Sequence, residues 1–482
     1  MRLTRTNTKL MVVAASNEER ETIDNAFAFD VENSVFVKKN HEKVHKEKVK
    51  GCWMCAWDGK HHFFGGKSLP AGFLSEVEGL VDCDIEDARI APQQQHEWNC
   101  SATLRDYQRN AVDAAIGGVS GIVEAATGAG KTIIAAGIVA ELGLRTIIIV
   151  PTKVIYTQFI DTFKEFTNID VGTIQGKTWE VDKPVVVAVM AGLTKDKKKA
   201  MAALAGRELI IIDEYHKSAA KTWYNTIAMC NAYYRFGLTA TPFRKDQLGC
   251  EFLRACTGNV LSSIKTKTLQ NTGYLSTTNI RIIKNDVYPP KYALDKEKQC
   301  MRKAVFVDKY RSCIATNPKR NAMIAEITNH HIKSGEKVLI ITAWSEHAHA
   351  IEDILNVDCI YLSGKDTAKK SREKAEAFKA MDGGVLIGTS VLDLGFDVPA
   401  IDVVVMAGAG DAKGRTQQRM GRGLRKSDGK EVAIIYDFLD NDIGGSRKYF
   451  NKHSIDRINT YTNLGQRITI FDSVEEAIIN NE

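Results

Sequence analysis

The chain has 482 residues, and 65 Lys and Arg against 59 Asp and Glu leave a formal net charge of +6. Hydrophobic residues make up 44% and charged residues 26%, with only 9 Pro, which is typical of globular chains and not of disordered or fibrous ones. No apolar run approaches the ~20 residues that cross a bilayer, and the apolar stretch at residues 10–15 is shorter than the core of a secretory signal. We therefore expect neither a membrane protein nor a secreted one, and the 10 scattered cysteines predict a reducing, intracellular setting.

Residues 1–98 differ in composition from the rest of the chain. Six Lys stand against two Glu at residues 38–50, and the aromatics and glycine turn signals that follow predict short strands and hairpins. A lysine run is usually a solvated surface, but lysines beside exposed aromatics also suit contact with nucleic acid. We predict a small basic α+β domain that binds DNA, with these candidate contacts: Lys46, Lys48, Lys50 and Trp57.

Cys52 and Cys55 have the CxxC spacing of a zinc ligand pair, and His41 and His45 lie upstream. A structural zinc needs four converging ligands, and no second tight pair of cysteines completes the usual spacing. The simpler interpretation is a strand that packs its tryptophans, and zinc stays as the alternative.

From Thr103 onward, short apolar runs alternate with amphipathic helical patterns. Strands that are buried on both faces of a parallel sheet have this character, and helices between them are the usual connections. We predict two parallel-sheet domains in tandem. The proline-containing segment 285–321 either separates these two domains or begins the second one. The first series of runs lies at 146–151, 184–190, 208–213 and 236–242, and the second at 338–342, 359–363, 384–389, 402–408 and 432–438.

The segment ATGAGKT, residues 126–132, follows a strand pattern and precedes a helical one, as a phosphate-binding loop does. Gly128 and Gly130 allow consecutive backbone N–H groups to face a polyphosphate at the positive end of the helix. Lys131 can then reach the terminal phosphates, and the hydroxyl of Thr132 can hold Mg²⁺. Ala126 replaces the first glycine of the strict motif.

A second pattern, ELIIIDEYH, places Asp213 and Glu214 at the end of an apolar strand, which is the edge where parallel sheets bind ligands. Asp213 is the candidate metal ligand, and Glu214 is the candidate acceptor of a proton from the attacking water. Two adjacent acids are costly unless cations balance them, and Mg²⁺ together with Lys131 would supply that balance.

These motifs, in this order, resemble those of the superfamily-two helicases and translocases of the DExH type over roughly residues 103–440. The matching segments are LRDYQRNAV, ATGAGKT, VPTKVIYTQF, DEYH and TATP, followed by VLIITAWSEHA, GTSVLDLGFDVP and QQRMGRGLRK. Within this resemblance the missing first glycine is normal. The resemblance implies an α/β chain with two tandem RecA-like domains, at residues 99–280 and 281–445. The small domain at 1–98 precedes them, and a C-terminal extension at 446–482 follows them.

The resemblance also implies roles for individual residues. Arg422 and Arg425 match the arginine fingers, which can raise the rate of phosphoryl transfer by ~10³–10⁵; a basic surface helix is the alternative. The implied ATP contacts are Gln108, Thr127, Gly128, Gly130, Lys131, Thr132, Asp397 and Gln418. The implied coupling residues are His216, Thr239 and Thr241, and the implied contacts to the DNA backbone are Thr152, Lys153 and Thr389.

The flanking segments extend the resemblance to one group of these enzymes. WDGK with FFGGKSLPAGFLSEVEGL, and YDFLDND with KYFNKHSIDRINTYTNLG, are similar to segments of the phage UvsW-type helicases. This implies an enzyme that uses ATP and Mg²⁺ to remodel branched DNA in recombination or repair, in the cytoplasm of a phage-infected bacterial host. The alternatives are a double-stranded DNA translocase without strand separation, an RNA helicase, and a clamp that binds ATP but never steps.

Overall fold

The computed structural model describes residues 1–31, 46–49, 52–55, 57–216, 221–241, 247–295, 300–389, 401–410, 416, 419, 432–444 and 448–479. Of the strands at 46–49 and 52–55 it describes the backbone. The chain divides into two compact units, one made of Met1–Ala125 with Gly130–Ile264 and the other of Ala126–Ala129 with the chain from Lys265 onward. No helix within the described ranges combines the length and the hydrophobicity that crossing a membrane demands.

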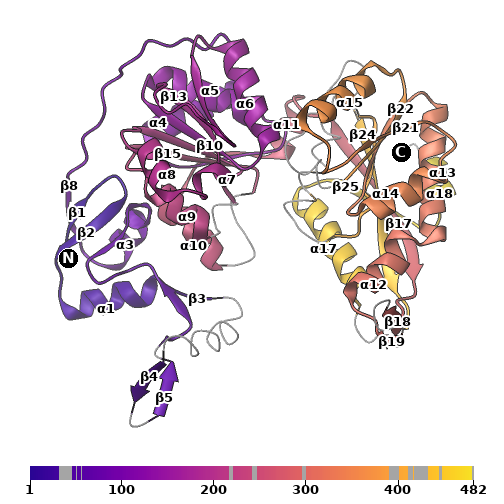
Figure 1. Cartoon of the computed structure of the whole chain (residues 1–482), viewed down its shortest axis with the longest axis horizontal. Coiled ribbons are helices and arrows are strands. Elements are labelled where there is room, and N and C mark those ends of the chain that lie inside the picture. Colours follow the sequence, from indigo (N-terminus) through magenta and orange to yellow (C-terminus); the bar gives the residue numbers. More distant parts are fainter. Residues whose placement is uncertain are drawn as a thin grey trace. The chain divides into compact units, whose positions relative to one another are not determined.

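The N-terminal part of the first unit is a small mixed sheet in the order β7-β2-β1-β8, covered by short helices (Figure 1). A capping box between Ser16 and Glu19 starts its first helix. Two hairpin-like pairs, β3 with β6 and β4 with β5, extend from it. The elements are β1 (Arg2–Arg5), β2 (Lys9–Ala14), α1 (Asn17–Ala26), β3 (Ala28–Asp30), β4 (Lys46–Val49), β5 (Cys52–Cys55), β6 (Lys60–His62), β7 (Ser68–Pro70), η1 (Ala71–Phe73), α3 (Leu74–Leu80) and β8 (Asp84–Asp87).

The rest of the first unit is a parallel sheet in the order β12-β11-β13-β10-β14-β15-β9-β16, with β12 antiparallel at one edge. Its central strands are buried along their whole length, as their apolar runs predict. The helices α4, α5 and α6 lie along one side of the sheet, and α8, α9 and α10 lie along the other (Figure 1). The elements are α4 (Asp106–Gly118), β9 (Ser120–Ala125), α5 (Lys131–Leu142), β10 (Thr146–Val150), α6 (Lys153–Phe166), β11 (Val171–Gln175), β12 (Thr178–Trp179), β13 (Val185–Val189), α7 (Met190–Leu193), α8 (Lys197–Leu204), β14 (Leu209–Asp213), α9 (Lys221–Ala228), β15 (Tyr234–Thr239), α10 (Gln247–Thr257) and β16 (Val260–Ile264).

The second unit is built on another parallel sheet, in the order β21-β22-β20-β23-β24-β17-β25. The helices α13, α14 and α18 lie on one side of it, and α15 and α17 lie on the other (Figure 1). The elements are α11 (Thr266–Asn271), β17 (Thr277–Val287), β18 (Tyr292–Asp295), β19 (Cys300–Lys303), α12 (Phe306–Tyr310), a π-helical turn η3 (Arg311–Ala315), α13 (Pro318–Lys333), β20 (Lys337–Ile341), α14 (Ser345–Glu352), β21 (Cys359–Leu362), α15 (Ala368–Ala380), β22 (Gly384–Gly388), β23 (Val403–Val405), β24 (Val432–Asp442), α17 (Tyr449–Asn463), β25 (Arg467–Phe471) and α18 (Val474–Ile479).

The α/β class with two parallel sheets is confirmed, and every apolar run named from the sequence overlaps a strand. The structure places its divisions differently from the sequence boundaries. The N-terminal sheet belongs to the same compact unit as the first parallel sheet, and β17, which spans residue 280, already belongs to the second sheet. The C-terminal segment is also part of that sheet, because β25 pairs with β17.

The N-terminal sheet and the first parallel sheet share one hydrophobic core. Phe63 and Phe73, from the N-terminal part, pack with Phe252 of α10, and the ring of Phe63 lies 5.1 Å from that of Phe73 and 5.2 Å from that of Phe252. Gly72 fits so closely against α10 that an added Cβ would lie 1.9 Å from the carbonyl oxygen of Arg254. Because aromatic burial contributes strongly to packing, this contact fixes the N-terminal sheet to the first parallel sheet.

Candidate nucleotide-binding site

The loop between β9 and α5, residues 126–130, has the backbone that a phosphate-binding loop needs. Gly128 and Gly130 have φ angles of +88° and +80°, which side chains other than glycine rarely adopt. A Cβ atom at Gly130 would lie 2.4 Å from Nε2 of Gln108, so a larger residue here would displace the end of that side chain. Gly130 caps α5, and the first N–H groups of a helix lack acceptors within the helix. Together with the helix dipole they favour an anion at this end.

Two threonines of this segment offer hydroxyl groups. The Oγ1 atom of Thr127 is buried and has no hydrogen-bond partner among the residues that the structure describes. A buried oxygen without a partner is costly in a folded protein, and a bound polar ligand would remove that cost. Thr132 is the second residue of α5 and is half-buried.

The predicted acidic pair lies at the carboxyl end of β14. Asp213 is the last residue of this strand and is 4% exposed, and Glu214 follows it, so the predicted strand end is confirmed. Glu214 has a φ angle of +49°, an uncommon conformation for a residue with a side chain. Its Oε1 atom lies 3.9 Å from Nζ of Lys131, and both side chains are largely buried. The structure thus brings the loop lysine and the acidic pair together.

A chain of contacts leads from Glu214 to the next strand. Nδ1 of His216 lies 3.4 Å from Oε2 of Glu214 and 3.1 Å from Oγ1 of Thr239, at the end of β15. The backbone N–H of Thr241 donates to the same Oγ1 over 3.1 Å. These contacts connect Glu214 with Thr239 and Thr241, and the coupling role of the histidine and the two threonines stays a prediction.

Tyr215 positions this segment and was not identified from the sequence. Its hydroxyl donates to the carbonyl oxygen of Leu253 over 2.6 Å, and complete burial raises the pKa of the phenol. Its ring lies over Gly237, where a Cβ would come within 2.2 Å of it. A glycine in the middle of the apolar β15 run was the available signal, since glycine within a strand often marks a close approach.

Gln108 lies on the first turn of α4, beside the loop, and is 5% exposed. Its Oε1 accepts the backbone N–H of Arg105 over 3.0 Å, and its amide nitrogen faces Gly130. The side chain is therefore held beside the phosphate-binding loop, and its contact with adenine stays a prediction.

The predicted DNA contacts are scattered over both units. Thr152 caps α6 by accepting the backbone N–H of Ile155, and Lys153 is exposed at the first position of that helix. Thr389 directly follows β22 in the second unit and is buried. The indole N–H of Trp57 donates to the carbonyl oxygen of Lys60, so a turn of the N-terminal part uses this group.

Several predicted residues lie outside the described part of the chain. They are Lys50, Asp397, Gln418, Arg422 and Arg425, and for Lys46 and Lys48 the structure describes only the backbone in β4. The same holds for Cys52 and Cys55 in β5. Within the described residues, no group of three or more His, Cys, Asp and Glu is arranged to hold a metal ion.

Comparison with known proteins gives two family matches. The family described as "Type III restriction enzyme, res subunit" matches residues 101–244, which contain the loop, the acidic pair and the threonines after β15. The family described as "Helicase conserved C-terminal domain" matches residues 318–427, which contain Asp397, Arg422 and Arg425.

The chain is also similar to curated proteins and to solved structures. A "DNA 3'-5' translocase XPB2" of Sulfurisphaera tokodaii is 26% identical over 364 residues, which are 69% of this chain and 80% of that protein. The "ATP-dependent DNA helicase uvsW" of Enterobacteria phage T4 is 23% identical over 454 residues, 84% of this chain and 88% of the phage protein. The structure of the "ATP-dependent Type ISP restriction-modification enzyme LlaBIII bound to DNA" aligns with a TM-score of 0.57 at 14% identity, over 83% of this chain and 34% of that one, and shows the same fold.

Proposed function

Because this chain belongs to the superfamily-two helicases and is an ATP-dependent DNA helicase close to the UvsW type, we propose that it remodels branched DNA. The reactions are branch migration, fork regression and unwinding of recombination or repair intermediates, in the cytoplasm of a phage-infected host. The observation that supports this most is the shared core of Phe63, Phe73 and Phe252, which fixes the N-terminal sheet to the first parallel sheet. A duplex that the N-terminal part holds would then keep a fixed position relative to this part of the motor.

The residues of the candidate site fit ATP and Mg²⁺. The loop needs glycine at Gly130, the hydroxyl of Thr127 is buried without a partner in the described chain, and Lys131 stands beside a buried acidic pair. In this proposal the loop and Lys131 hold the phosphates, and Thr132 and Asp213 hold the metal. Bound Mg²⁺ neutralises the negative charge that develops on the transferred phosphate.

Glu214 accepts a proton from the attacking water in this mechanism. Its carboxylate is held between Lys131 and His216, and its side chain is only 11% exposed. The ammonium group of Lys131 lies 3.9 Å from this carboxylate and supplies an opposite charge beside it. His216 and Thr239 then transmit the state of this carboxylate to Thr241, at the start of the segment that follows β15.

The second parallel-sheet domain completes the site in this proposal. Arg422 and Arg425 stabilise the charge of the transition state, Gln418 supports them, and Asp397 contacts the ribose. Closure of the two domains on ATP and their release after hydrolysis would give the stepping motion.

The DNA contacts follow from the same model of the motor. Thr152, Lys153 and Thr389 hold the tracked strand by its phosphates, and Lys46, Lys48, Lys50 and Trp57 grip the duplex at the junction. Contacts to phosphates carry no sequence information, so binding is independent of sequence and weakens with salt.

The test is strand separation on a panel of four substrates: a fork, a four-way junction, a blunt duplex and an RNA–DNA hybrid. We expect the fork and the four-way junction to be processed with ATP but not with a non-hydrolysable analogue, and the blunt duplex to stay intact. Equal activity on the blunt duplex would contradict a preference for branches, and preference for the hybrid would favour the RNA helicase.

A double-stranded DNA translocase is the second candidate, because one relative carries the name of a translocase. Displacement of a third strand from a linear triplex measures translocation without separation of the duplex. Triplex displacement with no activity on the fork or the four-way junction would establish this candidate in place of the first.

A further inference from the structure

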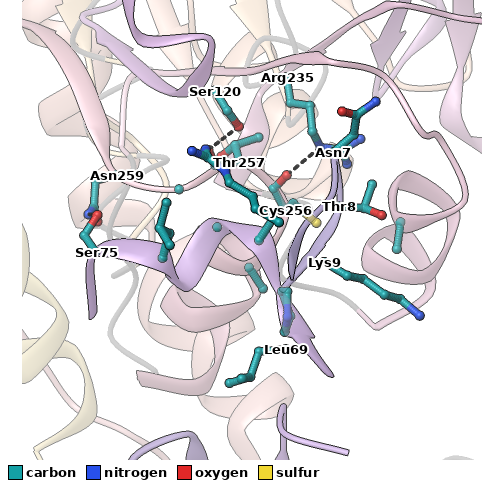
Figure 2. A pocket seen from close by; sticks show the side chains of 18 of the residues that line it. Asn7, Thr8, Lys9, Leu69, Ser75, Ser120, Arg235, Cys256, Thr257 and Asn259 are labelled. Atoms are coloured by element: carbon teal, nitrogen blue, oxygen red, sulfur yellow. Dashed lines mark hydrogen bonds between the residues drawn. The ribbon is translucent and has the colours of Figure 1, made fainter. Parts of the chain in front are cut away.

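The first unit contains a cavity of about 390 Å³ far from the nucleotide-binding loop (Figure 2). Ser120, Arg235 and Asn259 line it from the amino ends of β9, β15 and β16. Asp213 and Thr239 end their strands at the opposite, carboxyl edge of the same sheet. The other wall comes from the turn between β1 and β2, from β7 and from η1 of the N-terminal sheet. The cavity is therefore separate from the motor site and lies between two parts that share a core.

The lining is cationic. Arg5, Lys9, Arg89 and Arg235 contribute to it, and among the described residues no Asp or Glu does. Arg235 is already satisfied, because its guanidinium donates to the carbonyl oxygens of Cys256, Cys230 and Ile227. The positive charge that a ligand could use therefore comes mainly from the side chains of the N-terminal part.

Arg5 and Arg89 share a single carboxylate, that of Asp87. Arg89 binds it closely, over 2.7 Å, whereas Arg5 approaches it only to 4.0 Å. The Nε atom of Arg5 is buried and finds no acceptor among the described residues. Burial lowers the pKa of Arg5, and the charge of Arg89 lowers it further. Glu78 also lies near enough for its charge to act on Arg5. The guanidinium of Arg5 is nevertheless only loosely paired and has a buried Nε without an acceptor in the described chain, and a bound anion would supply that acceptor.

The cavity is larger than an inorganic anion needs. Its volume lies in the range of ~300–1,000 Å³ that small-molecule sites occupy. Tyr233, which stacks under the guanidinium of Arg89 at 5.1 Å, adds an aromatic face, and Leu69 and Leu261 add apolar surface. Hydroxyl and amide groups of Thr8, Ser75 and Asn259 complete the lining. A ligand with a charged phosphate and a flat, partly apolar body matches this combination.

We propose that this cavity binds a nucleotide bearing one phosphate group, with Arg5 and Arg89 on the phosphate and Tyr233 beside the base. The nucleotide is either free or the terminal nucleotide of a DNA strand, since both present the same chemistry. A bound nucleotide would bridge the N-terminal sheet and the first parallel sheet. This inference does not depend on the preference for branched DNA.

The test is calorimetric titration of the Lys131→Ala variant, in which the motor site is disabled, with inorganic phosphate, dAMP and a trinucleotide with a 5′-phosphate. We expect dAMP to bind at least about tenfold more tightly than inorganic phosphate, because only dAMP fills the cavity. Tighter binding of the trinucleotide than of dAMP, lost again when Arg5→Gln is added, would identify a strand end as the ligand, and binding of dAMP alone would identify a free nucleotide.

Variants of Arg5 test whether dAMP binds in this cavity. Adding Arg5→Gln should weaken the binding of dAMP at least about tenfold, because a charged hydrogen bond to the phosphate is lost. Arg2→Gln is the matched control, since Arg2 lies on the same strand, is 59% exposed and is not part of the lining. Should Arg5→Gln unfold, Arg5→Lys keeps the charge and should still weaken binding, because it cannot form the fork-shaped contact. No binding of any probe, or equal binding by the Arg5 variants and the parent, would overturn the proposal.

Discussion

Glu214 is largely buried and is held between a lysine and a histidine. We predict that Glu214→Gln lowers DNA-stimulated ATP hydrolysis by ~10²–10⁴, because the amide cannot accept a proton from water. Binding of ATP should change little, since the loop and Lys131 are kept. Phosphate release and titration with a fluorescent ATP analogue measure the two effects.

The matched control is Glu165→Gln, which removes one negative charge from the exposed surface of α6. It should hydrolyse ATP like the parent protein. A Glu214→Gln variant that hydrolyses ATP at the parent rate would show that another group takes the proton.

His347 makes the stability of the second unit sensitive to acid. This residue of α14 is completely buried, and its Nε2 lies 3.1 Å from Oδ1 of Asn321. Burial, assisted by the charge of Arg320, lowers the pKa of His347 to about 3, against about 6.5 in an unfolded chain. Between these values the unfolded chain binds more protons, so stability is full above the higher pKa and falls as the pH drops through the window, by up to about 1.4 kcal/mol per unit.

We therefore predict that His347→Gln loses less thermal stability between pH 7 and pH 5 than the parent protein, which circular dichroism can follow. His349→Gln is the control, because His349 lies on the same helix with its side chain 57% exposed. A parent-like pH dependence in His347→Gln would refute the assignment.

At the residue scale, the sequence was sufficient where the motif is local. Lys131 ends a glycine loop that follows a strand pattern, and Asp213 and Glu214 stand at the end of another, so their place at a sheet edge could be predicted from a few neighbouring residues. The contact between Tyr215 and Gly237 could not be predicted from the sequence. It depends on the register in which β14 pairs with β15, where Asp213 pairs with Leu238.

At the scale of elements, the close approach of η1 to α10 holds the N-terminal sheet in place. We predict that Gly72→Val destabilises the protein by about 1–3 kcal/mol, because its side chain would overlap the backbone of Arg254 and overpacking has costs of this size. Limited proteolysis should then release the N-terminal part earlier. Processing of forks should fall more than ATP hydrolysis does, if the fixed position of this part is needed for remodelling.

Gly79→Ala is the matched control for this prediction. Gly79 lies in α3, and an added Cβ there meets nothing within 4 Å. The change should be neutral or slightly stabilising, because alanine is a better helix former than glycine. Equal effects of the two substitutions would contradict the role of the contact between η1 and α10.

Strands with polar residues were the elements that the sequence did not reveal. β17 reads TTNIRIIKNDV, and two of its polar side chains are buried and paired: Asn285 donates to Asp440 over 2.8 Å, and Arg281 donates to Tyr436 over 2.9 Å. Residues that are distant in the sequence supply the hydrogen-bond partners of these side chains, so no local pattern indicates a buried strand. By contrast, β10, β13 and β14 are buried along their whole length and are apolar except at an end residue of β10 and of β14, and they were predicted.

At the scale of the whole molecule, the lysine run at residues 38–50, with six Lys against two Glu, should set the salt dependence of DNA binding. We predict that neutralising Lys46, Lys48 and Lys50 together reduces the slope of log K against log salt by about 0.9 for each lost phosphate contact. Fork binding at several salt concentrations measures this slope.

The control is neutralisation of Lys197, Lys198 and Lys199, which removes the same charge from α8. An unchanged slope in the first variant, or an equal change in both, would indicate that the lysine run is a solvated surface without a specific role in DNA binding.

The fixing of the N-terminal sheet to the first parallel sheet was not predictable from the chain. Phe63 and Phe252 are far apart in the sequence and belong to segments of different character, and nothing in their spacing indicates that their rings meet. The same holds for the cationic cavity, whose lining comes from both of these parts.

The place of β17 in its sheet has a consequence for biosynthesis. Both of its neighbours, β24 and β25, come much later in the chain. At ~5–20 residues per second, a ribosome releases β17 on the order of ten seconds before β24 follows. During this interval the nascent strand has both edges open, and Arg281 lacks the Tyr436 that later accepts its hydrogen bond. Chaperones that shield such edges should therefore raise the yield of this protein during expression.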